Sequence, residues 1–217
     1  MHISINNLTN IEEQIKFRFT QPINSEIIAV SKTFSMQQIK PLINHGHIHF
    51  GENKVQESVE KWTDVKDSLK NIKLHMIGKL QTNKVKYVIP LFDYIHSLDN
   101  FKLAEKISEE QNKRDKYLKI FIQVNIGNEQ QKSGIDPKEL KEFYNTCNSD
   151  LKLDVIGLMC IPPQDGDVKT YFAHMLNLKN SLNLKELSMG MSSDYLEAID
   201  YSSTFVRIGS KIFGDRN

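Results

Sequence analysis

The sequence predicts an α/β protein, a single (β/α)8 barrel of the TIM type with an extra helix before the first strand. Three observations lead to this prediction. Eight short apolar runs follow one another along the chain, helix-competent segments separate them, and nearly every run ends in polar or glycine residues. Alternating strands and helices with short connections are typical of βα units around a parallel sheet, and eight such units favour a closed barrel over an open sheet.

Each element follows from the apolar pattern. An amphipathic segment, residues 6–19, gives the extra helix. The expected strands are residues 26–31, 47–50, 73–77, 93–97, 117–125, 153–160, 184–188 and 204–208. The clearest helices between them are residues 53–69, 100–113 and 137–148. Because we find no internal repeat and no linker rich in Pro and Gly, we expect residues 1–217 to form one domain.

Composition and charge exclude several classes of protein. Lys and Arg number 28 against 27 for Asp and Glu, and the net charge of +1 gives no electrostatic reason to expect a nucleic-acid partner. Cys147 and Cys160 are too few for a disulfide framework and lack metal-ligand spacing. His45, His47 and His49 alternate, but only the last two would share a strand face, so we expect no metal. Without a leader or a long apolar run, we expect a soluble, cytoplasmic protein that is not in a membrane.

The strand ends indicate where the chemistry lies, because the carboxyl ends of parallel strands gather on one face of a barrel. Lys32 stands at the end of the first apolar run, residues 27–31. A lysine amine attacks a carbonyl only when it is unprotonated, and a partly dry barrel mouth favours that state. From its position alone, Lys32 could equally be a surface lysine at the start of a loop.

The last two strands suggest a site for a phosphate group. The run Ser188 to Asp194 ends the seventh strand and opens a helix, and Gly209-Ser210 follows the eighth strand. In barrels the loops after these two strands often bind phosphate, because unpaired N–H groups of helix ends attract anions. Ser193 or Asp194 could equally serve only as the helix cap.

Three further polar residues belong to this face. Arg207 lies within an apolar strand, so its guanidinium needs a partner inside the barrel mouth, either a carboxylate or a ligand atom. Asn53 and Asn125 follow the second and fifth strands and could hydrogen-bond a ligand, although either could instead cap the helix that follows.

With these residues assembled, the chain resembles the pyridoxal phosphate homeostasis protein family, single-domain relatives of the alanine racemase barrel. The resemblance extends from about residue 26 to the C-terminus. The matching stretches are residues 29–33, 49–57, 75–84, 97–99, 132–134, 157–159, 187–192 and 207–214.

The resemblance implies pyridoxal 5′-phosphate as cofactor, held by Lys32 as an internal aldimine. It places Arg207 at the pyridine nitrogen and Asn53 near the ring, and it surrounds the phosphate with Ser188, Met189, Gly209 and Ser210. The sequence departs from the family pattern at two positions. Ser210 stands where threonine is frequent and keeps the hydroxyl, and Cys160 stands where threonine is often found, which concerns packing near the ring.

The resemblance also bears on catalysis. A cationic Arg207 disfavours a proton on the ring nitrogen and weakens carbanion stabilisation. Racemases with this arrangement take a second base from a further domain of a partner subunit, for which a chain ending at Asn217 leaves no room. We therefore expect a non-catalytic carrier or buffer of pyridoxal phosphate that takes part in intracellular vitamin B6 homeostasis and hands the cofactor to apo-enzymes, as a monomer or weak homodimer.

Three alternatives remain at this point. The first is a weak pyridoxal phosphate-dependent amino-acid racemase that uses Lys32 with Tyr171 or Tyr195. The second is a Schiff-base aldolase that acts on a phosphorylated sugar with the same lysine and phosphate site. The third is a scaffold without a ligand, which leaves the shared face of lysine and phosphate site unexplained.

Overall fold

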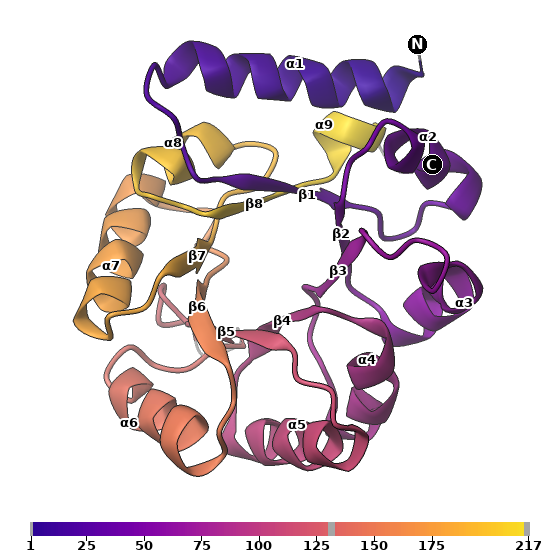
Figure 1. Cartoon of the computed structure of the whole chain (residues 1–217). Helices are drawn as coiled ribbons and strands as arrows, with labels where there is room; N and C mark the ends of the chain where they lie inside the picture. Colours follow the sequence, from indigo (N-terminus) through magenta and orange to yellow (C-terminus); the bar gives the residue numbers. More distant parts are fainter. Residues whose placement is uncertain (1, 130–132, 215–217) are drawn as a thin grey trace.

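In a computed structural model that describes residues 2–129 and 133–214, eight parallel strands close into a barrel with a helical ring outside it (Figure 1). Each strand pairs with the next, and the last pairs back onto the first. The strands are β1 (Glu26–Val30), β2 (His49–Glu52), β3 (Lys73–Met76), β4 (Tyr94–Leu98), β5 (Lys119–Gln123), β6 (Val155–Met159), β7 (Glu186–Ser188) and β8 (Phe205–Ile208).

The helices follow the strands as the (β/α)8 prediction requires, and that prediction is confirmed together with the helix before β1. The helices are α1 (Ile3–Arg18), α2 (Met36–Asn44), α3 (Val55–Lys66), α4 (Val85–Leu91), α5 (Phe101–Arg114), α6 (Leu140–Asn145), α7 (Val168–Ser181), α8 (Tyr195–Asp200) and α9 (Ser210–Phe213). Two short helical segments of other types are also present. These are a 3₁₀ helix, η1 (Thr82–Lys84), and a π-helix, η2 (Thr146–Asp150).

The element boundaries differ from the sequence prediction where local hydrogen bonds decide them. The first helix begins at Ile3 rather than at residue 6, because the His2 imidazole accepts from the Ser4 N–H and caps it. β2 begins at His49 rather than at residue 47, because Gly46, with φ 97°, and the His47 N–H bond to Leu42 O prolong the turn after α2.

The core has two parts. The larger lies between the sheet and the helices, where the α1 side chains Leu8, Ile11 and Ile15 are also buried. Outside the ring, α1 packs against α9 and α2 (Figure 1). A smaller cluster fills the barrel interior and consists of Ile28, Tyr94, Phe121, Met159 and Phe205. The barrel is therefore a packed core rather than a pore, and any ligand site must lie at a mouth.

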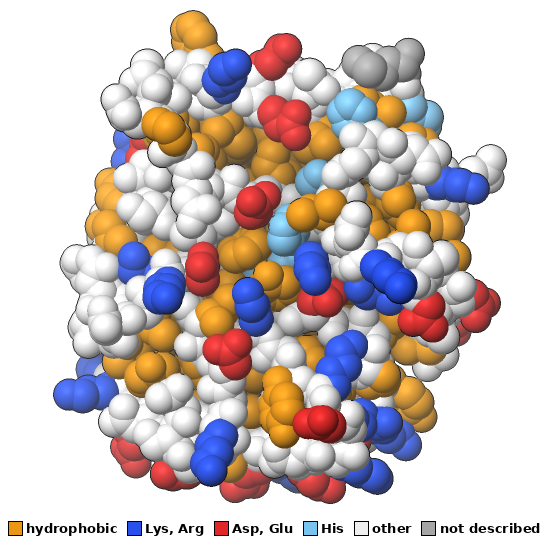
Figure 2. Space-filling model, viewed as in Figure 1, with side chains coloured by type: hydrophobic (Ala, Val, Ile, Leu, Met, Phe, Trp, Pro, Cys, Tyr) orange, Lys and Arg blue, Asp and Glu red, His pale blue; other side chains and the backbone are white. Residues whose placement is uncertain are grey.

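The surface carries no large field of one sign on the face that Figure 2 shows. Acidic and basic side chains are interspersed there, with apolar and histidine side chains between them (Figure 2). This distribution agrees with the net charge of +1. None of the helices in the described ranges combines the length and the apolar character of a membrane span.

Candidate functional site

A cavity of about 1040 Å³ opens at the carboxyl ends of the strands. Five of the site residues expected from the sequence line it, namely Lys32, Asn53, Arg207, Gly209 and Ser210. The polypeptide therefore brings the end of β1 and the end of β8 into one space, as these two strands are paired neighbours.

Ser188 and Met189 lie differently from these five. Ser188 is fully buried, and its Oγ contacts the Arg207 guanidinium at 2.8 Å. Met189 is fully buried in the core between sheet and helices. Neither is among the residues that line the cavity. Ser188 therefore does not line the cavity but contacts Arg207, which does. The Met189 side chain points away from the cavity.

Arg207 is a buried cation with only neutral partners. Its Nη1 donates to Ser188 O at 2.6 Å, and its Nη2 donates to Cys160 O at 2.8 Å. No ion pair among the described residues includes it. Burial lowers the pKa of Arg207 and raises that of the Cys160 thiol to about 12, so no thiolate neutralises the guanidinium. An anionic ligand at this mouth would offset the desolvation of Arg207.

Below Ser188 a chain of three histidines runs through the barrel interior. His96 Nδ1 lies 2.9 Å from Ser188 Oγ, His96 Nε2 lies 2.9 Å from His75 Nδ1, and His75 Nε2 lies 2.9 Å from His49 Nδ1. Burial lowers the pKa of His75 and His96 well below the ordinary value, and lowers that of His49 to about 4. The three rings are therefore neutral.

Sequence reasoning missed this chain. The available signal was one histidine at an inward-facing position in each of three consecutive strands, β2, β3 and β4. Among the described residues, no group of three or more His, Cys, Asp or Glu side chains is arranged so that it could hold a metal ion.

The loops after β7 and β8 meet at one side of the cavity. Ser192 and Ser193 line it, and Ser192 Oγ lies 3.1 Å from Ser210 Oγ. The cap of α8 is Asp194, whose carboxylate also accepts from the Met191 N–H at 2.6 Å and closes the loop. Ser192 and Ser193 therefore stay available to a ligand, together with the first N–H groups of α9, which have no acceptor within the helix.

Asn53 offers an unsatisfied polar group. Its Oδ1 is buried without a hydrogen-bond partner among the described residues, although Asn53 lines the cavity. The alternative that Asn53 caps the next helix is wrong, because Lys54 is the N-cap of α3. A Cβ on Gly78 would lie 2.2 Å from Asn53 O, so only glycine fits beside it. Buried polar atoms without a partner are rare and call for a ligand or water.

Asn125, in contrast to Asn53, has a side-chain amide that is hydrogen-bonded within its own loop. Its Nδ2 donates to Glu129 O at 3.0 Å, and its Oδ1 accepts from the Glu129 N–H at 3.2 Å. Both ends of the amide are used within the loop after β5. Asn125 therefore shapes the rim of the cavity and has less capacity left for a ligand than Asn53.

The tyrosines considered as a second base lie elsewhere. Tyr195 is buried, and its hydroxyl donates to Gln14 Oε1 at 2.7 Å. Tyr171 lies on α7, and neither tyrosine lines the cavity. Among the described lining residues, the titratable side chains are those of Lys32, Lys79 and Arg207.

Comparison with known proteins gives consistent matches over nearly the whole chain. The family model for the N-terminal domain of alanine racemase matches residues 3–217. The pyridoxal phosphate homeostasis protein of Aquifex aeolicus is 38% identical over 201 residues, which cover 88% of this chain and 87% of that protein.

Two solved structures of PipY from Synechococcus elongatus share the fold at 31% sequence identity. The one without pyridoxal phosphate superposes with a TM-score of 0.89, and the one with pyridoxal phosphate bound superposes with a TM-score of 0.85. Each comparison covers 98% of this chain and 100% of PipY.

Proposed function

Because the chain belongs to the pyridoxal phosphate homeostasis protein family, we propose that its cavity binds pyridoxal 5′-phosphate through Lys32 and that the protein helps to maintain the cell's supply of this cofactor. The binding of pyridoxal phosphate by PipY supports this proposal.

One observation carries the proposal, namely that a single cavity combines an amine with a buried cation that forms no ion pair among the described residues and with an unsatisfied amide oxygen. Lys32 supplies the amine, Arg207 the cation and Asn53 the oxygen. The amine fits an aldehyde, and the loops after β7 and β8, which line the same cavity, fit an anionic phosphate on the same ligand. The cavity volume of about 1040 Å³ is ample for a ligand of this size.

Each residue of the proposed site has its own role in binding. When bound, the cofactor would supply an aldehyde carbon that reacts with an unprotonated amine. Lys32 would provide that amine, Arg207 would hold the edge of the ring that carries its nitrogen, and Asn53 would hydrogen-bond near the ring. Gly209 and Ser210 would hold the phosphate together with Ser192 and Ser193, which line the same cavity, whereas Ser188 and Met189 do not line it.

We propose little or no catalytic turnover. Arg207 stays cationic and donates hydrogen bonds, so it does not deliver the ring-nitrogen proton that strengthens an electron sink. The competing function is weak amino-acid racemisation, and Lys79 is the group that favours it, because it is the other lining lysine. Incubation of the loaded protein with single enantiomers of amino acids, followed by chiral analysis, separates the two, and a substantial rate that Lys79→Met abolishes would establish the racemase.

The binding proposal is tested by fixing the bond with borohydride and mapping the modified peptide by mass spectrometry. We expect one modified lysine, Lys32, and a near-visible absorbance band that Lys32→Ala removes. Lys79→Met is the matched control, because it removes the neighbouring amine of the same cavity and should leave the band unchanged. Modification of another lysine, or none, would refute the assignment.

We propose further that the protein passes the cofactor to pyridoxal phosphate-dependent apo-enzymes in the cytoplasm, as a monomer or weak homodimer. Cys147 and Cys160 are both buried and unpaired, which suits a reducing compartment. Recovery of apo-enzyme activity in a mixture with the loaded protein, compared with recovery across a dialysis membrane, distinguishes direct transfer from release.

A further inference from the structure

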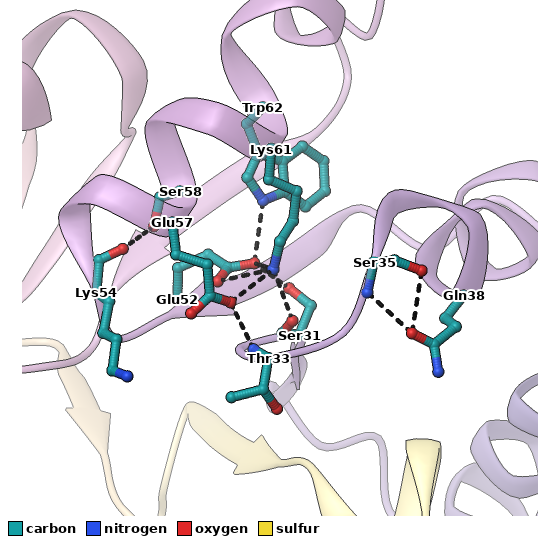
Figure 3. A network of polar contacts seen from close by, with 10 residues as sticks. All are labelled: Ser31, Thr33, Ser35, Gln38, Glu52, Lys54, Glu57, Ser58, Lys61 and Trp62. Atoms are coloured by element: carbon teal, nitrogen blue, oxygen red, sulfur yellow. Dashed lines mark hydrogen bonds and ion pairs between the residues drawn. The ribbon is translucent and has the colours of Figure 1, made fainter. Parts of the chain in front are cut away.

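Ser31 and Thr33, the two residues that flank Lys32 in the sequence, are both held by side chains from outside the cavity (Figure 3). On one side, Ser31 Oγ donates to Glu52 Oε1 at 2.7 Å, and Ser31 O accepts from Lys61 Nζ at 2.9 Å. On the other side, the Thr33 N–H donates to Glu57 Oε1 at 2.5 Å. The turn that carries the amine is therefore anchored at both ends.

The anchors belong to one network, which is buried at Glu52 and Lys61 and reaches the surface at Glu57. Lys61 Nζ donates to Glu52 Oε1 at 3.0 Å and to Glu57 Oε1 at 3.1 Å, in addition to Ser31 O. Trp62 Nε1 donates to Glu52 Oε1 at 3.0 Å. The Glu52 side chain is fully buried and that of Lys61 is 8% exposed. Breaking the Glu52–Lys61 pair would leave a buried charge without compensation, which is strongly destabilising. We therefore expect this pair to stay formed in the folded protein.

The same contacts distinguish Lys61 from Lys32. An ammonium group has three donors, and those of Lys61 are taken by Ser31 O, Glu52 and Glu57. An amine committed in this way has no lone pair for an aldehyde. Lys61 therefore acts on the turn rather than as a second nucleophile.

The turn needs an external hold, because Thr33 has a φ of 70°. A β-branched residue in the left-handed region is strained, and such a conformation persists only where the surroundings fix it. Glu57 supplies that hold at the Thr33 N–H, as Figure 3 shows. Beyond the turn, the Ser35 N–H donates to Gln38 Oε1 at 2.9 Å, so the start of α2 is fixed as well.

We propose that Glu57 and Lys61 are positioning residues, which hold the turn between β1 and α2 so that the Lys32 amine meets the aldehyde of bound pyridoxal phosphate. This inference rests on the proposed function. Its physical basis is that a reacting pair must be aligned at near-contact distance, and a misplacement of about 1 Å costs about 100-fold in rate. Neither residue lines the cavity, so their effect passes through the backbone of Ser31 and Thr33.

The test compares two ligands that differ only at the reacting carbon. Pyridoxal 5′-phosphate carries an aldehyde, whereas pyridoxine 5′-phosphate carries an alcohol and binds without condensation. For Glu57→Gln, which keeps the shape and removes the charge, we expect bond formation with pyridoxal 5′-phosphate to slow about 10- to 100-fold. Affinity for pyridoxine 5′-phosphate should stay within about twofold, since Glu57 lies outside the cavity.

Glu60→Gln is the matched control on the same helix. Glu60 is exposed and contacts Gln56 rather than the turn, so neither the rate nor the affinity should change. Glu57→Asp keeps the carboxylate one methylene further from Thr33 and should recover part of the lost rate. It also carries the test if Glu57→Gln does not fold, as thermal unfolding of each variant would show.

Each outcome has a distinct meaning. An unchanged rate in Glu57→Gln overturns the inference, and so does an equal loss for both ligands, because that pattern marks a general structural role. Failure of the unmodified protein to form a bond at Lys32 refutes the proposed function instead. Lys61→Met should reproduce the selective loss, and normal bond formation in that variant would remove Lys61 from the assignment.

Discussion

Thr33 adopts a backbone conformation that its own side chain disfavours, with a φ of 70°. The left-handed region costs about 1–2 kcal/mol for most residues, whereas asparagine enters it more readily. The Thr33 side chain is exposed. We therefore expect Thr33→Asn to raise the free energy of unfolding by about 0.5–1 kcal/mol, measured by urea denaturation.

Thr63→Asn provides the control for this change. Thr63 is equally exposed but lies within α3, where the backbone is helical and asparagine brings no relief. If Thr33→Asn lowers stability, the Thr33 side chain makes a contact that offsets its backbone strain.

At single positions, the sequence predicted best where burial and polarity conflict. Lys32 at the end of an apolar strand and Arg207 within one required an explanation, and both line the cavity. Met189 was grouped with Ser188 because they are adjacent in the motif. Successive side chains of a strand point to opposite faces, so Met189 lies in the outer core while Ser188 faces Arg207.

Across β2, β3 and β4, hydrogen bonding fixes the tautomer of each interior histidine. The Ser188 hydroxyl accepts from Arg207 Nη1, so its single proton must go to its other contact, His96 Nδ1. His96 must then carry its proton on Nε2 and donate to His75 Nδ1. By the same step His75 donates to His49, whose Nε2 lies 4.0 Å from Glu26 Oε2 at the other mouth.

We accordingly predict that all three rings are Nε2–H tautomers, which nitrogen-15 NMR of the imidazoles measures directly. A ring protonated on Nδ1 would contradict the direction imposed by Arg207. Ser188→Ala removes the hydroxyl that sets this direction and leaves His96 Nδ1 without a partner, so it should also cost about 1–3 kcal/mol of stability.

Over the whole molecule, the fold was predictable because its signal repeats. Each βα unit gives a strand-sized apolar run, and the polar strand ends gather wherever the sheet closes. The family membership predicted from the motifs is confirmed by the full-length relatives. The contacts of Lys61 with Ser31 and of His96 with Ser188 were not predictable, because residues 30 and 92 positions apart meet only after barrel closure.

The buried histidines should make the stability of the molecule depend on pH above the range where carboxylates titrate. Burial lowers the pKa of His47 and His49 to about 4, and that of His75 and His96 well below 6.5. Below pH 6.5 the unfolded chain binds protons that the folded protein does not. The free energy of unfolding should therefore fall as pH falls from 6.5 towards 4, by up to about 1.4 kcal/mol per pH unit for each histidine.

Urea denaturation between pH 5 and 7 measures this slope. Acidic groups add little in that interval. Burial raises the pKa of Glu57, for example, but hydrogen bonds to Thr33 and Lys61 outweigh this effect and hold that pKa below its ordinary value. His47→Gln keeps a donor for His49 O and removes one titrating ring, so it should reduce the slope by about 1.4 kcal/mol per pH unit. A flat profile in the unmodified protein would mean that the interior rings gain protons without unfolding of the protein. Protonated rings could not form the directional chain of hydrogen bonds from Arg207 to His49.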